Sequence, residues 1–443
     1  MLNKWKIGAL VCVALFGLLL RLNKFAQVPP PGLSLDEYSN AFVGLSIITN
    51  GIPVGMTGVD GNKVRFKAYI NPDLVYQETA NGDPMTLAYP WFDHPPLVGL
   101  VTGSYAYIKG ARVFEDVRAV VVRKPVVILS GVTIFLVGFY FATVFGFSYG
   151  LLAALLYAVS PLITIANRMV QAENFTTPLG LVILILSINK FNFKKLKYWI
   201  FLVATLLALT KLSGVAFVFG SSLILKKNSN QDWLWPIYGF TFGILLWVIY
   251  GNILSTFDFW AVLFNNSGRV YGLGLSAVTD LFTTTKLTGH KVIADGIVTA
   301  GTIAMLYQLV ENNKIKKLYI GIPMIAIVAV YLLFGSESYG WYRIPLYPFV
   351  CGSLAVLLID NLRNLWPLLV TSLLALGPSV SVLLSNISGA STVYRTLMLL
   401  GLAWGFRKND AIPKYFGVLI VLTVLGFGIF YNLLIDINWW YRI

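Results

Sequence analysis

Two adjacent carboxylates, Asp36 and Glu37, follow the first long apolar segment of the chain. Acidic residues are scarce in this protein, with 19 Asp and Glu against 33 Lys and Arg in 443 residues. A carboxylate beside a membrane can take a proton from a hydroxyl group or hold a cation. Asn40 lies one helical turn after Asp36 and would share its face, either orienting that carboxylate or capping polar surface. The pair indicates an enzyme.

Ser34 gives the same pair a structural interpretation. Ser followed three residues later by Glu is a capping box, in which Glu37 reaches back to the helix cap. This pattern is common at helix starts, so a structural and a catalytic role for Glu37 both stand. The box does not employ Asp36, which faces the positive end of the helix dipole. Asp36 is therefore the candidate general base, with Glu37 as its candidate partner.

A second informative string runs from Trp91 to Leu97 and contains Asp93, His94 and two prolines. Proline suits the first turn of a helix, and Asp93 or His94 can cap that helix. The apolar segment 95–108 would span about 21 Å as a helix, too short to cross a bilayer and suited to its interface. The string is either a polar cap or a contact to anionic or sugar groups.

Further charged residues lie near the predicted ends of apolar segments. Arg168 and Glu173 form either a structural pair or a functional one. Lys211 would be buried among apolar helices and needs an anion nearby, which a lipid phosphate would supply. Tyr342 and Arg343 begin another span, where the arginine either grips phosphate oxygens or anchors an aromatic belt. Cations from distant segments could thus bind a phosphate leaving group.

The amino-acid composition indicates the environment in which these residues lie. Hydrophobic residues make up 57% of the chain, charged residues 12%, and the mean hydropathy is +0.75, which predicts a polytopic membrane protein. The net charge of +14 comes from short lysine tracts between apolar segments, which argues against nucleic-acid binding. Cys12 and Cys351 each lie in an apolar segment, so no disulfide framework or thiolate metal site is expected. The absence of Walker, Rossmann, HExxH and nucleophile-elbow motifs argues against ATP, NAD or hydrolase chemistry.

Thirteen segments are apolar enough to be candidate spans, and an all-α polytopic fold with about thirteen transmembrane helices is predicted. They are 5–21, 125–144, 149–165, 175–189, 198–210, 213–225, 234–251, 292–310, 318–334, 344–359, 366–384, 392–406 and 414–432. The fifth and sixth are interpreted as a hairpin turning near residues 211–214, because lysines flank the pair on both sides.

The lysine tracts place the N-terminus inside and the loop 22–124 outside. Fifteen of the 19 acids then lie outside, counting Asp295 at the outer end of the span 292–310, so the chemistry is predicted on the extracytoplasmic face. A second outer loop is expected at 252–291. Residues 1–360 are predicted to form the catalytic transmembrane domain, including that first loop, and 361–443 to form C-terminal transmembrane helices.

An ordered set of strings resembles the GT-C superfamily of membrane glycosyltransferases, specifically the protein O-mannosyltransferase and aminoarabinose-transferase group. The resemblance covers residues 1 to about 360 and implies a large first extracytoplasmic loop carrying juxtamembrane helices. The strings are Leu35-Asp36-Glu37-Tyr38, Asp93-His94-Pro95-Pro96-Leu97, Ser160-Pro161 with Arg168 and Glu173, Leu209-Thr210-Lys211, and Tyr342-Arg343-Ile344-Pro345-Leu346-Tyr347-Pro348.

The resemblance implies a monosaccharide donor on polyprenyl or dolichyl phosphate and inverting transfer to a lipid, a cell-surface glycan or a protein. It implies Asp36 as the base, or as the organiser of the acceptor, with Glu37 in support. Arg168, Lys211 and Arg343 would contact the lipid phosphate. Need for a divalent cation stays open, and a prokaryotic plasma membrane is the expected location.

The chain departs from the group in two respects. Mannosyltransferases usually carry a lysine soon after the His-Pro-Pro-Leu string, where this chain has Val98-Gly99-Leu100. No large insertion resembling their lumenal sugar-binding domain is present, so protein mannosylation is not the default. The Trp-Trp-Asp-Tyr-Gly motif of oligosaccharyltransferases is also absent. The alternative function is a multispan transporter or lipid flippase, for which paired broken helices and ionisable residues near the bilayer midplane are expected.

Overall fold

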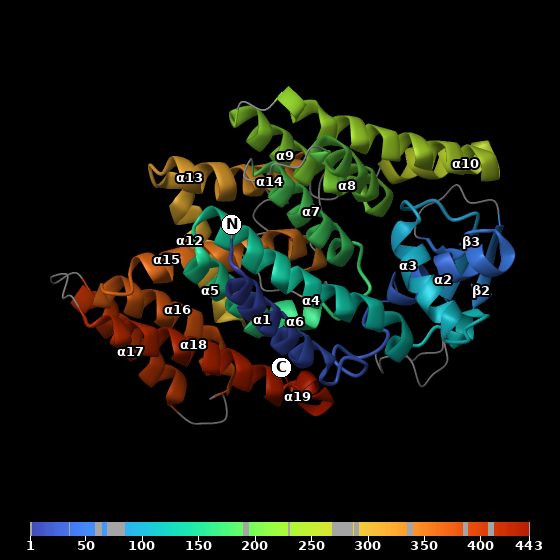
Figure 1. The fold of residues 1–443 in the computed structure, drawn as a ribbon. Coiled ribbons are helices and arrows are strands. Elements are labelled where there is room, and N and C mark those ends of the chain that lie inside the picture. Colours follow the sequence, from blue (N-terminus) through green and yellow to red (C-terminus); the bar gives the residue numbers. More distant parts are fainter. Residues whose placement is uncertain are drawn as a thin grey trace.

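A computed structural model describes most of the chain, and helices dominate it (Figure 1). The described residues are 2–34, 36–57, 64–68, 85–188, 195–228, 231–267, 287, 292–334, 340–383, 389–405 and 412–442. The helices of the first part are α1 (Lys4–Leu22), α2 (Asp36–Asn50), α3 (Leu97–Ile108), α4 (Ala119–Val144), α5 (Phe147–Val159), α6 (Pro161–Ala166), α7 (Glu173–Ser187), α8 (Leu196–Thr210), α9 (Val215–Lys227) and α10 (Trp235–Ser267).

The remaining helices follow α10 in the same pattern of apolar segments and short turns. They are α12 (Gly296–Val310), α13 (Lys314–Lys316), α14 (Ile322–Phe334), α15 (Tyr347–Asp360), α16 (Leu365–Leu383), α17 (Ala390–Gly405), α18 (Lys414–Leu434) and α19 (Ile437–Arg442). Short 3-10 or π turns are η2 (Phe114–Asp116), η3 (Leu212–Gly214), η4 (Gln231–Leu234), η5 (Lys317–Gly321) and η6 (Gly340–Leu346).

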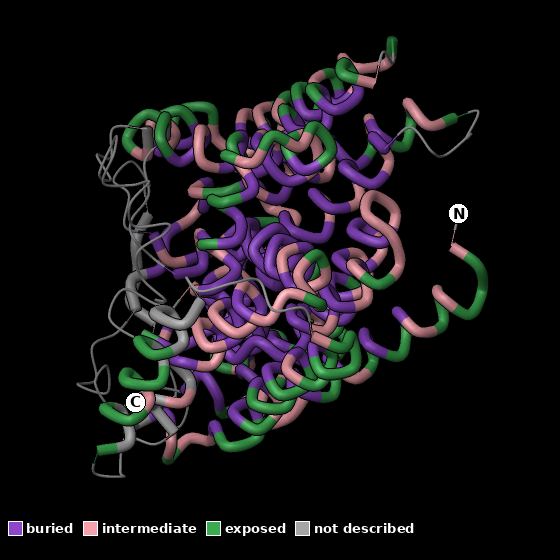
Figure 2. The backbone as a smooth tube through the Cα atoms, turned by 90° about the vertical axis from the view of Figure 1, so that its left-hand side faces the viewer, coloured by how far each residue is buried: buried purple, intermediate pink, exposed green. Residues whose placement is uncertain are grey.

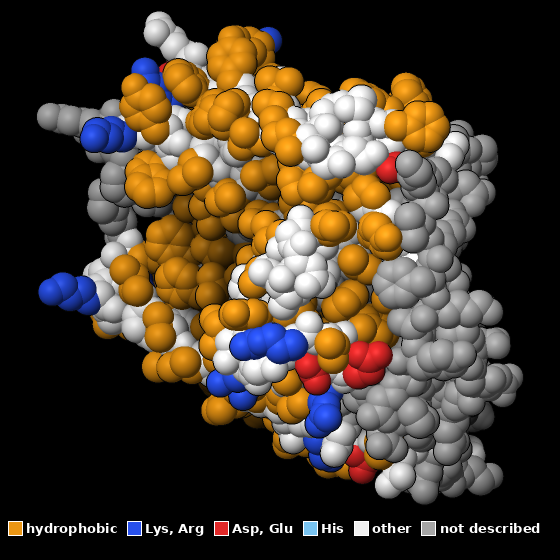
Figure 3. Space-filling view, turned by 90° about the vertical axis from the view of Figure 1, so that its right-hand side faces the viewer, with side chains coloured by type: hydrophobic (Ala, Val, Ile, Leu, Met, Phe, Trp, Pro, Cys, Tyr) orange, Lys and Arg blue, Asp and Glu red, His pale blue; other side chains and the backbone are white. Residues whose placement is uncertain are grey.

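The outward faces of the helices are apolar, as expected for a multi-pass membrane protein. Leu19, Phe257 and Leu419 are among many large hydrophobic side chains that are exposed. Buried backbone forms the centre in Figure 2, and Figure 3 shows a face dominated by hydrophobic side chains and hollowed in one place. Among the described residues, six helical segments of at least 18 residues are long and apolar enough to cross a membrane, and six apolar helices are shorter. The predicted count of thirteen spans is not confirmed.

The region around Lys211 forms two helices, as predicted. Helix α8 ends at Thr210, Lys211 is extended with φ −162° and ψ 138°, and α9 begins after η3. The predicted span 149–165 is likewise divided, because Ser160 ends α5 and caps α6, with Pro161 in its first turn. The structure therefore has more helix breaks than hydropathy alone requires.

A small antiparallel sheet makes the all-α prediction incomplete. Its strands are β1 (Gly55–Met56), β2 (Val64–Ala68) and β3 (Met85–Tyr89), arranged in the order β1-β3-β2. In β2, apolar and charged side chains alternate from Val64 to Lys67, which is the period of a half-buried strand. This signal lies in the loop 22–124, where only helices were expected.

Helix α10 extends beyond its predicted end at residue 251. It continues to Ser267 and breaks at Ser255, where φ is −167° and ψ is 103°. The Ser255 hydroxyl accepts from the Asp258 amide (3.4 Å) and donates to its carboxylate (2.6 Å), which restarts the helix. The rings of Phe259 and Trp247 are 5.4 Å apart, so the second half folds back on the first. Most of the expected outer loop 252–291 after Ser267 lies outside the described residues.

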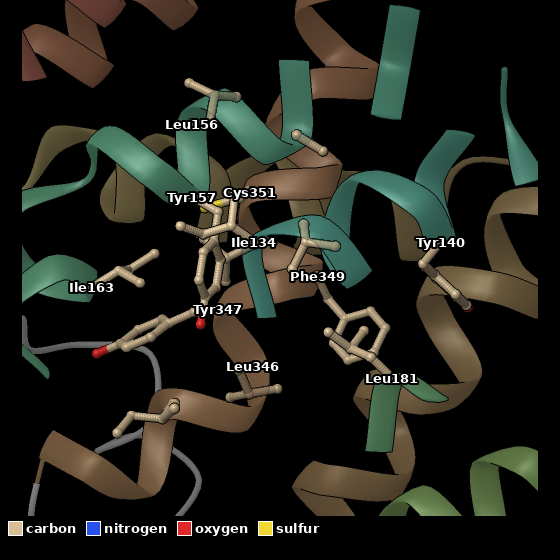
Figure 4. Close-up of a cluster of buried hydrophobic side chains, with 14 of the residues drawn as sticks. Ile134, Tyr140, Leu156, Tyr157, Ile163, Leu181, Leu346, Tyr347, Phe349 and Cys351 are labelled. Carbon is tan, nitrogen blue, oxygen red and sulfur yellow. The ribbon is translucent and has the colours of Figure 1, made fainter. Parts of the chain in front are cut away.

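Side chains from α4, α5, α7 and α15 meet in one hydrophobic core (Figure 4). Ile134, Tyr157, Leu181 and Phe349 are fully or almost fully buried there. Asn432 of α18 donates a hydrogen bond to the Val159 carbonyl of α5 (2.6 Å), which ties a C-terminal helix to the same core.

Glycines allow α2 and α3 to pack backbone against backbone. A Cβ added to Gly44 would lie 1.8 Å from the Gly99 carbonyl oxygen, and one added to Gly103 would lie 2.2 Å from the Leu45 nitrogen. Such an approach is possible only without side chains. The contact brings the start of α3, with the preceding Asp93-His94 string, beside the helix that carries Asp36, as Figure 1 shows.

Candidate functional site

A small pocket brings together residues of two strings singled out in the sequence, 93–97 and 209–211, and residues next to two others, Asn40 and Ala172. Its lining comprises Asn40 and Val43 of α2, Trp91, His94, Pro95 and Pro96 before α3, Val98 and Gly99 of α3, Ala172 before α7, and Thr210 at the end of α8. The pocket holds about 10 Å³, close to the space of one water molecule. Asp36 precedes Asn40 by one helical turn and shares its side of α2.

The first turn of α2 holds both predicted carboxylates, and the two are placed differently. Asp36 is the first residue of α2 and is partly buried, whereas Glu37 is 1% exposed. Asn40 donates from its side-chain amide to the Val170 carbonyl (3.2 Å). Burial, with a smaller effect of the Glu37 carboxylate, raises the pKa of Tyr38, so its hydroxyl stays protonated. Asp36 is thus the carboxylate of the pair with access to solvent.

Glu37 forms an ion pair in place of the predicted capping box. Arg123 donates to both of its carboxylate oxygens, at 2.8 Å from Nε and 2.7 Å from Nη2. The Val170 amide donates to the same carboxylate at 3.3 Å. Ser34 accepts a hydrogen bond from the Gln171 side chain (2.8 Å). Burial of a charged carboxylate is costly unless a cation pairs with it. Glu37 therefore binds Arg123 and does not form the predicted capping box.

Arg123 was not identified from the sequence, although a charge inside an apolar helix is a functional or structural signal. It lies in the first turns of α4 and is fully buried. Besides Glu37, its Nη1 donates to the carbonyls of Phe25 (2.9 Å) and Pro29 (2.7 Å). Arg123 therefore fixes the segment between α1 and α2 from one side.

Arg168 fixes the same segment from the other side. Its guanidinium donates to four backbone carbonyls, of Leu20 (3.0 Å), Arg21 (3.1 Å), Asn23 (2.7 Å) and Val28 (3.0 Å). Arg168 itself is 2% exposed. The sequence suggested a lipid-phosphate contact or a pair with Glu173 for this residue, and the structure pairs Glu173 with another cation.

That cation is Lys211. Its ammonium lies 2.5 Å from Glu173 Oε1, with side-chain exposures of 13% for the lysine and 0% for the glutamate. The second oxygen of Glu173, Oε2, is buried, and no residue in the described part of the chain forms a hydrogen bond with it. The lysine ammonium also lies 4.6 Å from the centre of the Tyr342 ring. The anion that Lys211 requires is therefore present within the protein.

The string around Arg343 joins this corner of the molecule. It forms η6, whose Arg343 is 4% exposed and follows Tyr342 directly. The Tyr331 hydroxyl of α14 donates to the Tyr342 carbonyl at 2.7 Å. A fifth predicted string thus reaches the pocket region through the contact between Tyr342 and Lys211.

Asp93 and His94 differ in exposure. The Thr57 hydroxyl lies 2.7 and 2.9 Å from the two carboxylate oxygens of Asp93, beyond the end of β1. Asn266, from the folded-back part of α10, donates to the Asp93 carbonyl at 3.2 Å. His94 is exposed, and its ring lies edge-on to Trp91 at 5.9 Å. Asp93 therefore holds the string in place, while His94 lines the pocket.

Comparison with solved structures identifies the fold of the chain. ArnT from Cupriavidus metallidurans bound to undecaprenyl phosphate aligns with a TM-score of 0.53 and 13% identity over 96% of this chain and 77% of ArnT. Its apo structure aligns at 0.51 with 15% identity over 96% and 76%. The chain has the GT-C fold. The oligosaccharyltransferase AglB from Archaeoglobus fulgidus aligns at 0.48 with 12% identity over 97% and 55%. No protein-family model and no curated protein sequence matches the chain.

Within this GT-C fold, two further buried acids escaped the sequence interpretation. Asp295 is fully buried and accepts from the Ser160 hydroxyl (2.5 Å) and from the amides of Leu162 and Ile297 (2.9 Å each), which joins the starts of α6 and α12. It lay inside a predicted span and was not singled out. Asp258, assigned to a loop from the sequence, is buried in α10 with Oδ1 lacking a partner.

The part of the GT-C fold that the structure describes contains no group of three or more His, Cys, Asp and Glu side chains placed to hold a metal ion. Two described acids near the pocket each pair with a cation of the protein: Glu37 with Arg123, and Glu173 with Lys211.

Proposed function

We propose that this protein is a glycosyltransferase that moves a monosaccharide from a polyprenyl or dolichyl phosphate to an acceptor on the extracytoplasmic side of the plasma membrane. The meeting of two predicted strings and of residues next to two others at one pocket, with Tyr342 in contact with Lys211, carries the proposal. ArnT, which shares the fold, was solved with undecaprenyl phosphate, and this supports a lipid-linked donor. The acceptor is a lipid, a cell-surface glycan or a protein.

Asp36 is the proposed general base. It takes the proton of an acceptor hydroxyl while the hydroxyl oxygen attacks the anomeric carbon opposite the phosphate. The new carbon–oxygen bond forms as the bond from the anomeric carbon to the phosphate breaks, and its electron pair leaves with the lipid phosphate. Attack from the opposite side inverts the anomeric configuration.

Lys211 and Arg343 are the proposed contacts of the phosphate, because cations stabilise the charge that develops on the leaving group. Tyr342 lies against Lys211 and completes this side of the site. Asn40 and His94 line the pocket and are proposed to contact the sugar or the acceptor. The pocket enlarges when substrates bind in this proposal, since its present volume holds about one water molecule.

The other predicted residues act by positioning the base. Glu37, with Arg123, and Arg168 hold the segment that leads into α2, so the first turn of that helix cannot shift. Asp93 holds the string before α3 in the same way. Arg168 is left out of the phosphate site because its guanidinium already donates to four carbonyls.

The experiment compares Asp36→Asn with the wild type in proteoliposomes supplied with radiolabelled polyprenyl-phosphate sugars, one donor at a time. Loss of a general base is expected to slow transfer by about 100-fold or more. Glu115→Gln, which changes an exposed acid in the same outer segment, is the matched control and is expected to retain full activity. Transfer by Asp36→Asn at the wild-type rate would overturn the role of Asp36. Absence of sugar release from every donor would favour a transporter.

A further inference from the structure

The negative charge of Glu173 is unfavourable for binding a lipid phosphate at this site. Its carboxylate lies 2.5 Å from the ammonium of Lys211, the cation proposed to hold that phosphate. Glu173 is fully buried, and Oε2 has no hydrogen-bond partner among the described residues. An anion in such surroundings repels a second anion strongly, because low dielectric strengthens every charge interaction. A site built only for tight phosphate binding would lack this carboxylate.

Both residues of the pair directly follow a residue of the pocket lining in the chain. Ala172 and Thr210 line the pocket, and the next residues in the chain are Glu173 and Lys211. The lysine is 13% exposed while the glutamate is fully covered, so a phosphate would meet the ammonium first and the carboxylate behind it. The Lys211–Glu173 pair carries no net charge.

The proposed reaction changes the charge of the lipid phosphate. The donor is a phosphodiester with one negative charge. The product is a phosphate monoester, which carries between one and two negative charges near neutral pH because its second pKa is about 6. The ammonium of Lys211 can contact the single negative charge of the donor. Glu173 already balances that ammonium, so no positive charge is left over to offset the second charge of the product.

We propose that Glu173 is a positioning residue that holds Lys211 and limits the affinity of the site for the lipid-phosphate product, so that the product leaves after transfer. The inference rests on the proposed glycosyltransferase function. Glu173 does not touch the reacting atoms; it acts through Lys211 and through its own charge. Its role is thus discrimination between a singly and a doubly charged phosphate.

Glu173→Gln is the test, because glutamine keeps the size and hydrogen-bonding capacity of the side chain but removes its charge. Binding of polyprenyl phosphate and of the polyprenyl-phosphate sugar to purified protein in nanodiscs is measured for both proteins. The variant is expected to bind the product about tenfold more tightly and the donor much less than tenfold more tightly. In steady-state assays, its product inhibition should strengthen and its kcat should fall.

Glu311→Gln is the matched control. Glu311 pairs with Lys316 at 2.9 Å between α12 and α13, so the substitution also removes a carboxylate from a Lys–Glu pair. Neither lipid affinity should change in this variant. A change in donor affinity as large as that in product affinity for Glu173→Gln would overturn the inference, because a merely structural role alters both ligands alike.

A second measurement uses only the wild type, in case Glu173→Gln does not fold. Polyprenyl phosphate is compared with its methyl ester, a phosphodiester of the same chain that carries one charge. The wild type is expected to bind the monoester no more tightly than the methyl ester, and tenfold tighter binding of the monoester would overturn the inference. If donor binds and sugar is transferred without this discrimination, only the inference fails. If the wild type binds none of these lipids, the proposed function fails with it.

Discussion

The two buried glutamates near the site belong to ion pairs of different kinds. In the Glu37–Arg123 pair, neither side chain is more than 1% exposed, and both carboxylate oxygens accept from the guanidinium. The remaining arginine nitrogen, Nη1, donates to two backbone carbonyls. In the Glu173–Lys211 pair, the lysine is 13% exposed, and within the described ranges only one carboxylate oxygen has a partner. Every charged donor and acceptor group of the first pair is used, whereas the second pair can still accept a further hydrogen bond.

The difference indicates which pair fixes the fold and which can respond to a ligand. A guanidinium presents donors in a rigid planar fork and suits a permanent arrangement of oxygens. An ammonium is a compact charge on a flexible stem, so it can exchange one anion for another. Of these two pairs, the arginine pair holds the segment before α2, and the lysine pair lies where a phosphate is proposed to enter.

Removal of Arg123 should have the largest effect on stability. Arg123→Met leaves the Glu37 carboxylate buried without its cation and two carbonyls without a donor, which should cost about 3–5 kcal/mol of unfolding free energy. Thermal unfolding of the purified protein in detergent measures the loss. Arg118→Met, at an exposed arginine just before α4, is the control and should unfold like the wild type. Equal stability of Arg123→Met and the control in thermal unfolding would show that the Glu37–Arg123 pair does not stabilise the fold.

Replacement of Arg168, which donates to four carbonyls, should destabilise the protein even when the positive charge is kept. Arg168→Lys retains the positive charge but loses the planar fork, and about 2 kcal/mol of stability should be lost with the unmade hydrogen bonds. Arg118→Lys should cost nothing measurable. Lys211→Arg, the reverse exchange in the other pair, should cost less than Arg168→Lys. The order of the three melting temperatures tests the comparison, and a greater loss for Lys211→Arg would reverse it.

The sequence predicts the membrane-protein class and most of the helices, because these depend on hydrophobic segments. It also predicts the break near Lys211, which follows from charge on both sides of a segment too short for two full spans. It does not predict the sheet in the outer loop or the fold-back of α10. The fold-back depends on a break at Ser255 and on the packing of Phe259 against Trp247. Hydropathy assigns Trp247 to a helix and Phe259 to a loop, so it does not predict their contact.

For the site, the sequence identifies chemistry-bearing residues but not their partners. It singles out Glu37, Glu173 and Lys211, yet it misses Arg123 and assigns a lipid phosphate as the anion of Lys211. Partners are set by tertiary contacts between residues 38 positions apart for Lys211 and 86 apart for Arg123. Local patterns such as the capping box favour near neighbours, so they gave Glu37 the wrong hydrogen-bond partner.

The smallest expected effect is the coupling within the Glu173–Lys211 pair. A double-mutant cycle with Glu173→Gln and Lys211→Met should give a coupling free energy of about 1 kcal/mol, close to that of a partly exposed pair. The same cycle with Glu37→Gln and Arg123→Met should give about 3 kcal/mol, as expected for a fully buried pair whose single substitutions leave a charge unpaired.

The two coupling energies decide whether the lysine pair can open. A phosphate can compete with Glu173 for Lys211 only if the pair contributes little to folding, since a strongly coupled pair would resist any exchange of partners. Added polyprenyl phosphate should therefore lower the Glu173–Lys211 coupling and leave the Glu37–Arg123 coupling unchanged. A lysine pair coupled as strongly as the arginine pair, and insensitive to the lipid, would make both pairs structural.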